Sequence, residues 1–263
     1  MKCRDVVEFL EREVPLDGAE SWDNPGFLVG DMEQEVRKIL VVLDITNEVV
    51  EMAVKENVDF ILAHHPVIFS KIQKCTSDDF LQKKLLTLIR NDICCYGMHT
   101  NYDVYRMCDA VGRRLCLTAD APVEISSNPA LASDNKGIGF ISTFKEKKSL
   151  QEFAKKVKND FGLDSVMIYG DPQQQIEKVA VVPGSGKSLM KEAMEKEADV
   201  LVTGDFGHHE GLDAVDMGLT VIDAGHYGLE QVFIDDMEEL LKKKLPECEI
   251  ISLKAGSPFK VII

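Results

Sequence analysis

The sequence of 263 residues is poor in basic side chains: 30 Lys and Arg stand against 45 Asp and Glu, a formal net charge of −15. This charge repels phosphate backbones and anionic lipids, so non-specific binding to nucleic acid or to a membrane is disfavoured. Gly (18) and Pro (9) are not enriched above the usual level, and apolar residues make up 45%. The composition excludes a disordered or fibrous chain and fits a globular protein long enough for about two domains.

Long apolar runs are also absent. No segment approaches the ~18 uninterrupted apolar residues of a membrane span, and the first residues, MKCRDVVEFLEREVPLDGAE, are charged throughout, unlike a signal peptide. We therefore expect a cytoplasmic protein. There is no Cys-x-x-Cys pair, and an odd number of cysteines fits reduced thiols better than a disulfide framework or a thiolate zinc site. The seven are Cys3, Cys75, Cys94, Cys95, Cys108, Cys116 and Cys248.

An internal repeat organises the chain. Residues 36–66 align without gaps on residues 176–206, so that Asp59 matches Asp199. Each copy reads as an apolar strand, a helix and a second apolar strand, which predicts parallel strands joined by right-handed crossovers and covered on both faces. The expected elements are strands at about 38–43 and 58–63 around a helix from the cap Thr46 to about 57, and strands near 178–182 and 199–203 around a helix capped by Ser185 or a neighbour.

A third strand completes each copy and ends in His-x₃-carboxylate, because ICCYGMHTNYD can be laid over TVIDAGHYGLE. We interpret this shared order as a duplication. Periodicity is lost over residues 119–137, where Pro, Ser and Asn gather. The prediction is an α/β fold of two duplicated, possibly intertwined domains with mainly parallel sheets, residues 1–127 and 128–263, and a metal site in the cleft between them.

All six histidines lie in three short clusters. His64 and His65 end a strand and precede Pro66, at the carboxyl edge of the sheet where open α/β folds bind ligands. A turn there could direct both imidazoles at adjacent metal ions. The alternative is that one ring packs in the core and the other is solvated.

Two His-x₃-carboxylate pairs occupy corresponding places in the two copies. On a turn of helix, His99 and Asp103 project on one face, as do His226 and Glu230, the spacing that a shared metal or proton-transfer site requires. Imidazole and carboxylate are ligands of borderline divalent ions such as Zn²⁺, Mn²⁺, Fe²⁺ or Ni²⁺. The lack of thiolates favours a catalytic site over structural zinc.

Three loops carry further candidates. Gly204, Asp205, His208 and His209 follow the equivalent strand of the second copy, where they could hydrogen-bond to ligands or contact substrate, or simply be a solvated loop. GSGKS resembles a phosphate loop, but Val181 stands where the full motif needs Gly, so its amides either hold an anion or shape a tight helix entry. The loop from Trp22 to Gly26, which contains Asn24, reads by itself as turn chemistry with a packed aromatic.

Five motifs together resemble the family of GTP cyclohydrolase 1 type 2 homologues, or Nif-three-like proteins. They are WDNPG at 22–26, HHPVIF at 64–69, HTNYD at 99–103, GDFGHH at 204–209 and DAGHYGLE at 223–230. The resemblance implies a dinuclear metal centre, intertwined α/β domains and a toroidal homohexamer. The metal ligands it implies are His64, His65, Asp103, His226 and Glu230, with Glu230 bridging.

The resemblance does not fix the reaction, because the ligand set suits hydrolysis of a phosphoester or an amide-type bond as well as opening of the guanine ring of GTP. We expect a metal-dependent hydrolase of a small, possibly nucleotide substrate. We expect two divalent ions per chain, one on His64 and His226 and one on His65 and Asp103, with His99 or Asp205 transferring protons. Asn24, Gly204, His208 and His209 are expected to support the ligands or contact substrate. The competing hypothesis is a non-catalytic metal-binding, metal-delivering or interaction protein. An architectural DNA clamp conflicts with the charge of −15.

Overall fold

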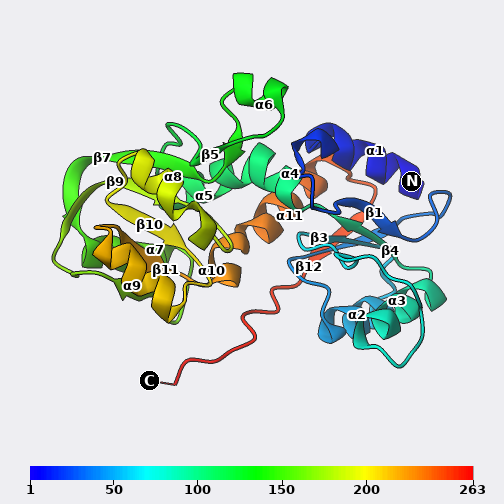
Figure 1. Ribbon diagram of the computed structural model, residues 1–263. Helices are drawn as coiled ribbons and strands as arrows, with labels where there is room; N and C mark the ends of the chain where they lie inside the picture. Colours follow the sequence, from blue (N-terminus) through cyan, green and yellow to red (C-terminus); the bar gives the residue numbers. More distant parts are fainter. Residues whose placement is uncertain (263) are drawn as a thin grey trace. The chain divides into compact units, whose positions relative to one another are not determined.

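A computed structural model describes residues 1–262. The chain forms two compact units (Figure 1). The first comprises Met1–Tyr105 and Phe233–Ala255, and the second comprises Arg106–Val232 with the residues from Gly256 onward. A C-terminal helix and strand thus belong to the first unit. The division of the chain into two duplicated domains after residue 127 stays a prediction.

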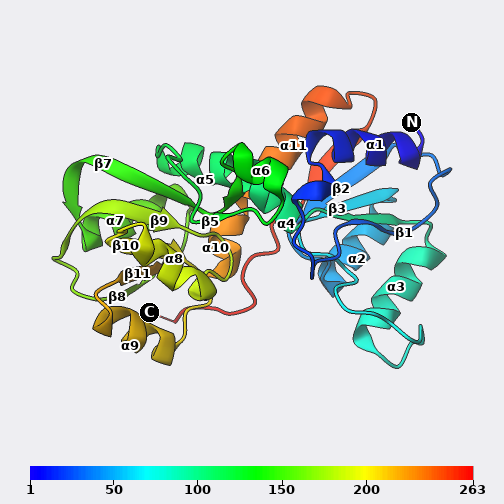
Figure 2. The ribbon, with the colours of Figure 1, turned by 45° about the horizontal axis from the view of Figure 1, so that its top comes forward.

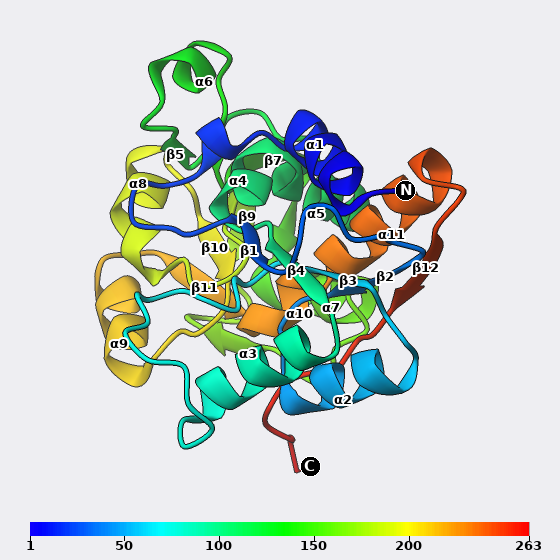
Figure 3. The same cartoon turned by 90° about the vertical axis from the view of Figure 1, so that its right-hand side faces the viewer.

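The first unit is a five-stranded sheet with helices on both faces. Strands β12, β2, β3 and β4 are parallel, and β1 is antiparallel at the edge beside β4. Helices α2 and α3 cover one face, and α1 lies on the other (Figures 1 and 3). Its elements are α1 (Cys3–Glu13), η1 (Leu16–Gly18), β1 (Gly26–Val29), β2 (Lys38–Val42), α2 (Asn47–Lys55), β3 (Phe60–Ala63), α3 (Phe80–Arg90), β4 (Cys94–Gly97), α4 (Thr100–Tyr102), α11 (Val232–Lys244, from Phe233) and β12 (Glu249–Ser252).

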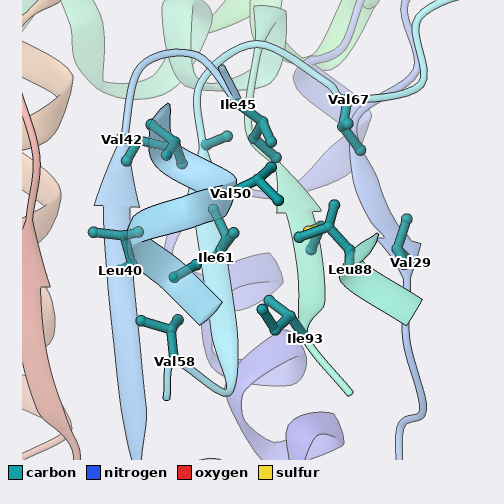
Figure 4. Packing of buried hydrophobic residues seen from close by; sticks show 14 of the residues in the cluster. Val29, Leu40, Val42, Ile45, Val50, Val58, Ile61, Val67, Leu88 and Ile93 are labelled. Atoms are coloured by element: carbon teal, nitrogen blue, oxygen red, sulfur yellow. The ribbon is translucent and has the colours of Figure 1, made fainter. Parts of the chain in front are cut away.

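Apolar side chains of the strands pack against α2 and α3 in this unit. Figure 4 shows Leu40 and Ile61 on the strands facing Val50 of α2 and Leu88 of α3. The expected cap is confirmed, since the Thr46 hydroxyl accepts a hydrogen bond from the amide of Val49 at 3.2 Å. Because the central strands are buried on both faces, their carboxyl ends are the positions from which polar side chains can reach a ligand.

The second unit is also built on a five-stranded sheet. Strands β9, β10 and β11 are parallel, β8 is antiparallel beside β11, and β7 is antiparallel beside β9. Helices α8 and α9 pack on one face through Ala193 and Ala214 (Figure 2). Its elements are α5 (Cys108–Leu115), β5 (Glu124–Ile125), α6 (Pro129–Ser133), β6 (Gly137–Ile138), β7 (Phe140–Ser149), α7 (Leu150–Asp160), β8 (Met167–Tyr169), β9 (Gln175–Val181), η3 (Lys187–Leu189), α8 (Met190–Glu195), β10 (Val200–Thr203), α9 (His208–Asp216), β11 (Thr220–Asp223) and α10 (His226–Glu230). The π-helix η2 (Asp103–Met107) crosses from one unit to the other.

In both units, an aspartate carboxylate accepts hydrogen bonds from two successive backbone amides at a neighbouring strand. In the first unit, Asp59 accepts hydrogen bonds from the amides of Arg37 and Lys38 at 2.8 and 2.9 Å. In the second, Asp199 accepts them from Glu177 and Lys178 at 2.7 and 2.9 Å. The protein is therefore a mixed α/β protein with mainly parallel sheets, as expected. The repeated geometry is what a duplication predicts, and the duplication itself stays a prediction.

The helical segment after β9 begins at Gly186, a neighbour of Ser185, as expected. Gly186 caps a 3-10 turn, and helix α8 itself begins only at Met190. The amide of Gly186 donates to the Thr203 hydroxyl at 2.8 Å, so that amide serves tight helix entry and is not free for an anion. No helix within residues 1–262 is long and apolar enough to cross a bilayer.

Candidate metal centre

His64 and His65 leave the sheet at the carboxyl end of β3, as expected. His64 is fully buried, and its Nδ1–H donates to the carbonyl oxygen of Met98 at 2.8 Å. His65 is partly exposed, and its Nδ1 lies 2.7 Å from Oδ1 of Asp44, which follows β2. Neither ring is an ordinary core or solvated residue, because each is oriented by an acceptor at Nδ1 and directs Nε2 elsewhere.

His99 follows β4 and caps α4. Its Nδ1 lies 2.8 Å from Oδ1 of Asp23, and the other oxygen of Asp23 accepts from the amide and hydroxyl of Thr100 at 3.0 and 2.5 Å. Burial alone would raise the pKa of Asp23, but the hydrogen bonds from His99 and Thr100 outweigh it and lower this pKa from 3.8 to about 2. The carboxylate is therefore ionised near neutral pH and keeps His99 protonated on Nδ1.

Four candidate donors of the first unit lie together. His64, His65 and His99 each offer one nitrogen, and these atoms lie within 4.8 Å of one another. Nε2 of His64 also lies 3.6 Å from Oδ1 of Asp103 on η2. Two ligands about 2.1 Å from one tetrahedral ion are about 3.4 Å apart, so this separation suits a shared metal ion. The structure brings Asp103 to His64, whereas the expected helical spacing had paired it with His99.

The second unit presents the other expected pair. His226 and Glu230 are one turn apart on α10, and Nε2 of His226 lies 2.9 Å from Oε2 of Glu230. Glu230 is buried, with 4% of its surface exposed. Nδ1 of His226 lies 2.7 Å from Oδ2 of Asp205, which therefore orients the imidazole.

Close backbone contacts hold this second set. Gly204 lies so near the backbone of Gly225 and His226 that no Cβ fits there, and its amide donates to the carbonyl of Gly184 at 2.8 Å. Gly184 has a φ of +74°, and a Cβ on it would meet Oε1 of Glu230. Because neither glycine carries a Cβ, the backbone can lie close to His226 and Glu230 without blocking their donor atoms.

Asp223 holds the loops on either side of this set. It is buried at the end of β11, where burial raises its pKa, and it accepts hydrogen bonds from the amides of Phe206 and Gly225 at 3.0 and 2.8 Å. Together with Asp44 it was missed by sequence reasoning. The available signal was the position of each at the carboxyl end of a parallel strand, next to a histidine loop.

The imidazoles of His64, His65, His99 and His226 share one arrangement. In each, Nδ1 engages a carbonyl or carboxylate oxygen, so the neutral ring carries its hydrogen there and presents an Nε2 lone pair. Metal-binding histidines in proteins are oriented in this way. With carboxylates beside them and no thiolate, these donors fit borderline divalent ions.

The remaining candidates play smaller parts in the geometry. Asn24 donates from Nδ2 to the carbonyl of Ile68 at 2.6 Å and so ties two loops together. His208 and His209 begin α9 as exposed side chains, with ring centroids 5.2 Å apart. Trp22 is not the packed aromatic that the turn reading predicted, since 59% of it is exposed. The loop is held by the hydrogen bonds of Asp23 and Asn24, the residues after Trp22, and not by burial of the Trp22 ring.

The fold and the donor set define a mixed α/β protein whose histidine and carboxylate groups could hold a metal ion. Residues 1–257 match the family described as Duf34/NIF3 (NGG1p interacting factor 3), and the chain belongs to this family.

Relatives and solved structures agree with this assignment. A Clostridium perfringens protein named GTP cyclohydrolase 1 type 2 homolog is 32% identical and covers 100% of both chains, and one from Methanocaldococcus jannaschii is 35% identical over 96% of this chain and 99% of its own. Reduced HcgD from Methanocaldococcus jannaschii has a TM-score of 0.84 at 34% identity, covering 97% of this chain and 98% of its own. Staphylococcus aureus hypothetical protein SA1388 has a TM-score of 0.88 at 28% identity, covering 100% and 99%.

Proposed function

We propose that the protein binds two divalent metal ions and is a metal-dependent hydrolase of a small, possibly nucleotide substrate. The ligands are His64, His65 and Asp103 of the first unit and His226 and Glu230 of the second. The observation that carries the proposal is the common arrangement of the imidazoles: each Nδ1 bonds to an oxygen acceptor, and Nε2 of His64 and of His226 faces a carboxylate, that of Asp103 or Glu230. Relatives named GTP cyclohydrolase 1 type 2 homolog support a nucleotide-related reaction.

The separation of donor atoms supports a specific allocation. Nε2 of His64 and Oδ1 of Asp103, 3.6 Å apart, suit one ion, in place of the pairing of His65 with Asp103 expected from the sequence. Nε2 of His226 and Oε2 of Glu230, 2.9 Å apart, match the ~3.0 Å between neighbouring ligands of an octahedral ion. Because Glu230 has a second carboxylate oxygen, we propose that it bridges the two metal ions.

Bound divalent ions would lower the pKa of a coordinated water and polarise a carbonyl or phosphoryl oxygen. The chain's own residues then position and move protons. His99 is the candidate for proton transfer, because Asp23 holds its hydrogen on Nδ1 and leaves Nε2 able to accept a proton. Asp205 bonds to His226, and we propose that it orients this ring and does not itself transfer a proton. The family resemblance also favours a cytoplasmic homohexamer as the working form.

Metal analysis of purified variants tests the proposal. Asp103→Asn and Glu230→Gln keep the side-chain shape but remove the charge, and each is expected to lose at least one ion per chain by mass spectrometry. Asp109→Asn and Glu195→Gln change exposed carboxylates in α5 and α8 and serve as matched controls with wild-type stoichiometry. Unchanged metal content in both site variants would exclude these ligands.

Turnover is tested separately. Wild-type protein loaded with Mn²⁺, Zn²⁺, Fe²⁺ or Ni²⁺ is incubated with nucleotides and simple phosphoesters, and products are identified by mass. We expect hydrolysis that Glu230→Gln abolishes and that a chelator suppresses. Stoichiometric metal with no product from any substrate would instead support the non-catalytic metal-binding alternative.

A further inference from the structure

Two large aromatic side chains of the first unit are exposed beside the histidines. Trp22 is 59% exposed and Phe69 is 52% exposed, and their ring centroids lie 6.1 Å apart. The centroid of His99 lies 6.1 Å from that of Trp22 and 6.3 Å from that of Phe69. Trp22 meets His99 at an interplanar angle of 75°, so the imidazole does not cover its face by stacking.

The backbone around Trp22 is fixed although its ring is exposed. Asp23, the residue after Trp22, bonds to His99 and Thr100. The next residue, Asn24, donates to the carbonyl of Ile68, the residue before Phe69. The loops that carry the two aromatic rings are therefore joined directly. A pair of rings held in place beside candidate catalytic groups is preorganised for a ligand, since little conformational entropy is lost when one binds.

The chemistry of the surface favours a planar ring. Exposed aromatic faces bind nucleic-acid bases by stacking, which is tolerant of base identity. A purely aliphatic ligand would gain the apolar contact but not the stacking. The ring of a nucleotide placed on Trp22 and Phe69 would lie next to His99, on the side from which the proposed chemistry acts.

Cations on the adjoining loop complement this surface. Lys71 and Lys74 follow Phe69 by two and five positions, and both are exposed. The two lysines lie on the segment that follows Phe69, in a chain with a formal charge of −15. Ammonium groups bind phosphate oxygens by charge-assisted hydrogen bonds.

We propose that Trp22 and Phe69 form a platform for the base of a nucleotide whose phosphate is bound by Lys71 and Lys74. Because the two rings are tilted by 56° to each other, the base stacks on one ring and meets the other at its edge. This inference rests on the proposed function, because it assigns the substrate class of that site. It adds a binding subsite whose residues are distinct from the metal ligands, so it can be tested by binding alone.

The test uses the one tryptophan of the chain, because its fluorescence reports the platform directly. Full-length protein as purified is titrated with GMP, guanosine and ribose 5-phosphate, with correction for ligand absorbance against free tryptophanamide. We expect saturable quenching by GMP, quenching at higher concentration by guanosine, and none by ribose 5-phosphate. Equal quenching by GMP and ribose 5-phosphate would overturn the platform.

Variants separate the two parts of the subsite. Phe69→Ala is expected to raise the Kd for GMP about tenfold, the loss typical of one stacking partner. Phe80→Ala, a change at another exposed phenylalanine of the same unit, is expected to leave Kd unchanged. Lys71→Gln with Lys74→Gln should weaken GMP but not guanosine. Wild-type affinity in Phe69→Ala would refute the proposal.

The outcome is distinguishable from failure of the proposed function. If the protein holds metal but hydrolyses nothing, the GMP titration still saturates and Phe69→Ala still weakens it. If the platform is wrong, Phe69→Ala binds GMP as the wild type does, while the metal content and the losses in Asp103→Asn and Glu230→Gln are unaffected.

Discussion

Asp23 and His99 form a hydrogen-bonded pair in which Oδ1 of the carboxylate lies 2.8 Å from Nδ1 of the imidazole. The side chain of Asp23 is fully covered, and its second oxygen is occupied by the amide and hydroxyl of Thr100. An ionised carboxylate only accepts hydrogen bonds, so the imidazole must donate. The pair therefore fixes both the tautomer and the direction of His99 and links the loop after η1 to the end of β4.

The low pKa of Asp23 predicts a loss of stability in acid. Its pKa is about 2 in the folded protein against 3.8 ordinarily, so the folded state binds this proton less readily than the unfolded chain. The resulting stabilisation is present above pH 3.8, amounts to about 2 kcal/mol, and is lost as the pH falls toward about 2.

Denaturant unfolding of wild type and Asp23→Asn across this range measures the effect. The free energy of unfolding of the wild type should exceed that of the variant at neutral pH, and the two curves should converge in acid. Parallel curves at every pH would show that Asp23 does not titrate with a lowered pKa.

Asp44 and Asp205 should control metal affinity without being ligands. Each engages Nδ1 of a candidate ligand, His65 and His226 respectively, at 2.7 Å. Removal of such an orienting carboxylate typically weakens metal binding 10- to 100-fold. We expect Asp44→Asn and Asp205→Asn each to raise the Kd for Zn²⁺ by about this factor in a chelator competition, with ion stoichiometry unchanged at saturating metal. Loss of an ion at saturation would instead make the residue a ligand.

Much of this architecture could be predicted from periodicity. The strands that end at Ala63 and Thr203 are short, almost entirely apolar and followed by polar loops, so their parallel pairing and the edge that carries the histidines follow from the pattern. The helical spacing of His226 and Glu230 also predicted their contact.

The rest depends on contacts between residues distant in the sequence. Asp44 and His65 are 21 positions apart, and Asp23 and His99 are 76 apart, so no local pattern links either pair. The exposure of Trp22 was likewise hidden, because a turn sequence does not tell whether its aromatic ring is buried. His99 is the non-helical cap of α4, with φ −108° and ψ −110°, so an ideal i,i+4 spacing does not anticipate that Asp103 meets His64.

Asp59 and Asp199 should contribute equally to their units. Each carboxylate accepts hydrogen bonds from two successive amides, at the start of β2 for Asp59 and within β9 for Asp199, with donor–acceptor distances between 2.7 and 2.9 Å. Asp59→Ala and Asp199→Ala should each lower the free energy of unfolding by about 2 kcal/mol, because two charge-assisted hydrogen bonds are lost. Asp164→Ala, at an exposed position, is the control with an expected change under about 0.5 kcal/mol. A large loss at one aspartate and none at the other would contradict the equivalence.

Gly184 should be required for the second donor set for two separable reasons. Its φ of +74° disfavours any residue with a Cβ, and that Cβ would meet Oε1 of Glu230 and approach Nε2 of His226 at 3.5 Å. Gly162 provides the matched control, since its φ is +64° and nothing lies within 4 Å of its Cβ position. We expect Gly184→Ala and Gly162→Ala each to lose about 1 kcal/mol of stability from backbone strain, but only Gly184→Ala to lose metal content. If both variants kept the wild-type ion count, the space beside Glu230 and His226 would have no role in holding a metal ion.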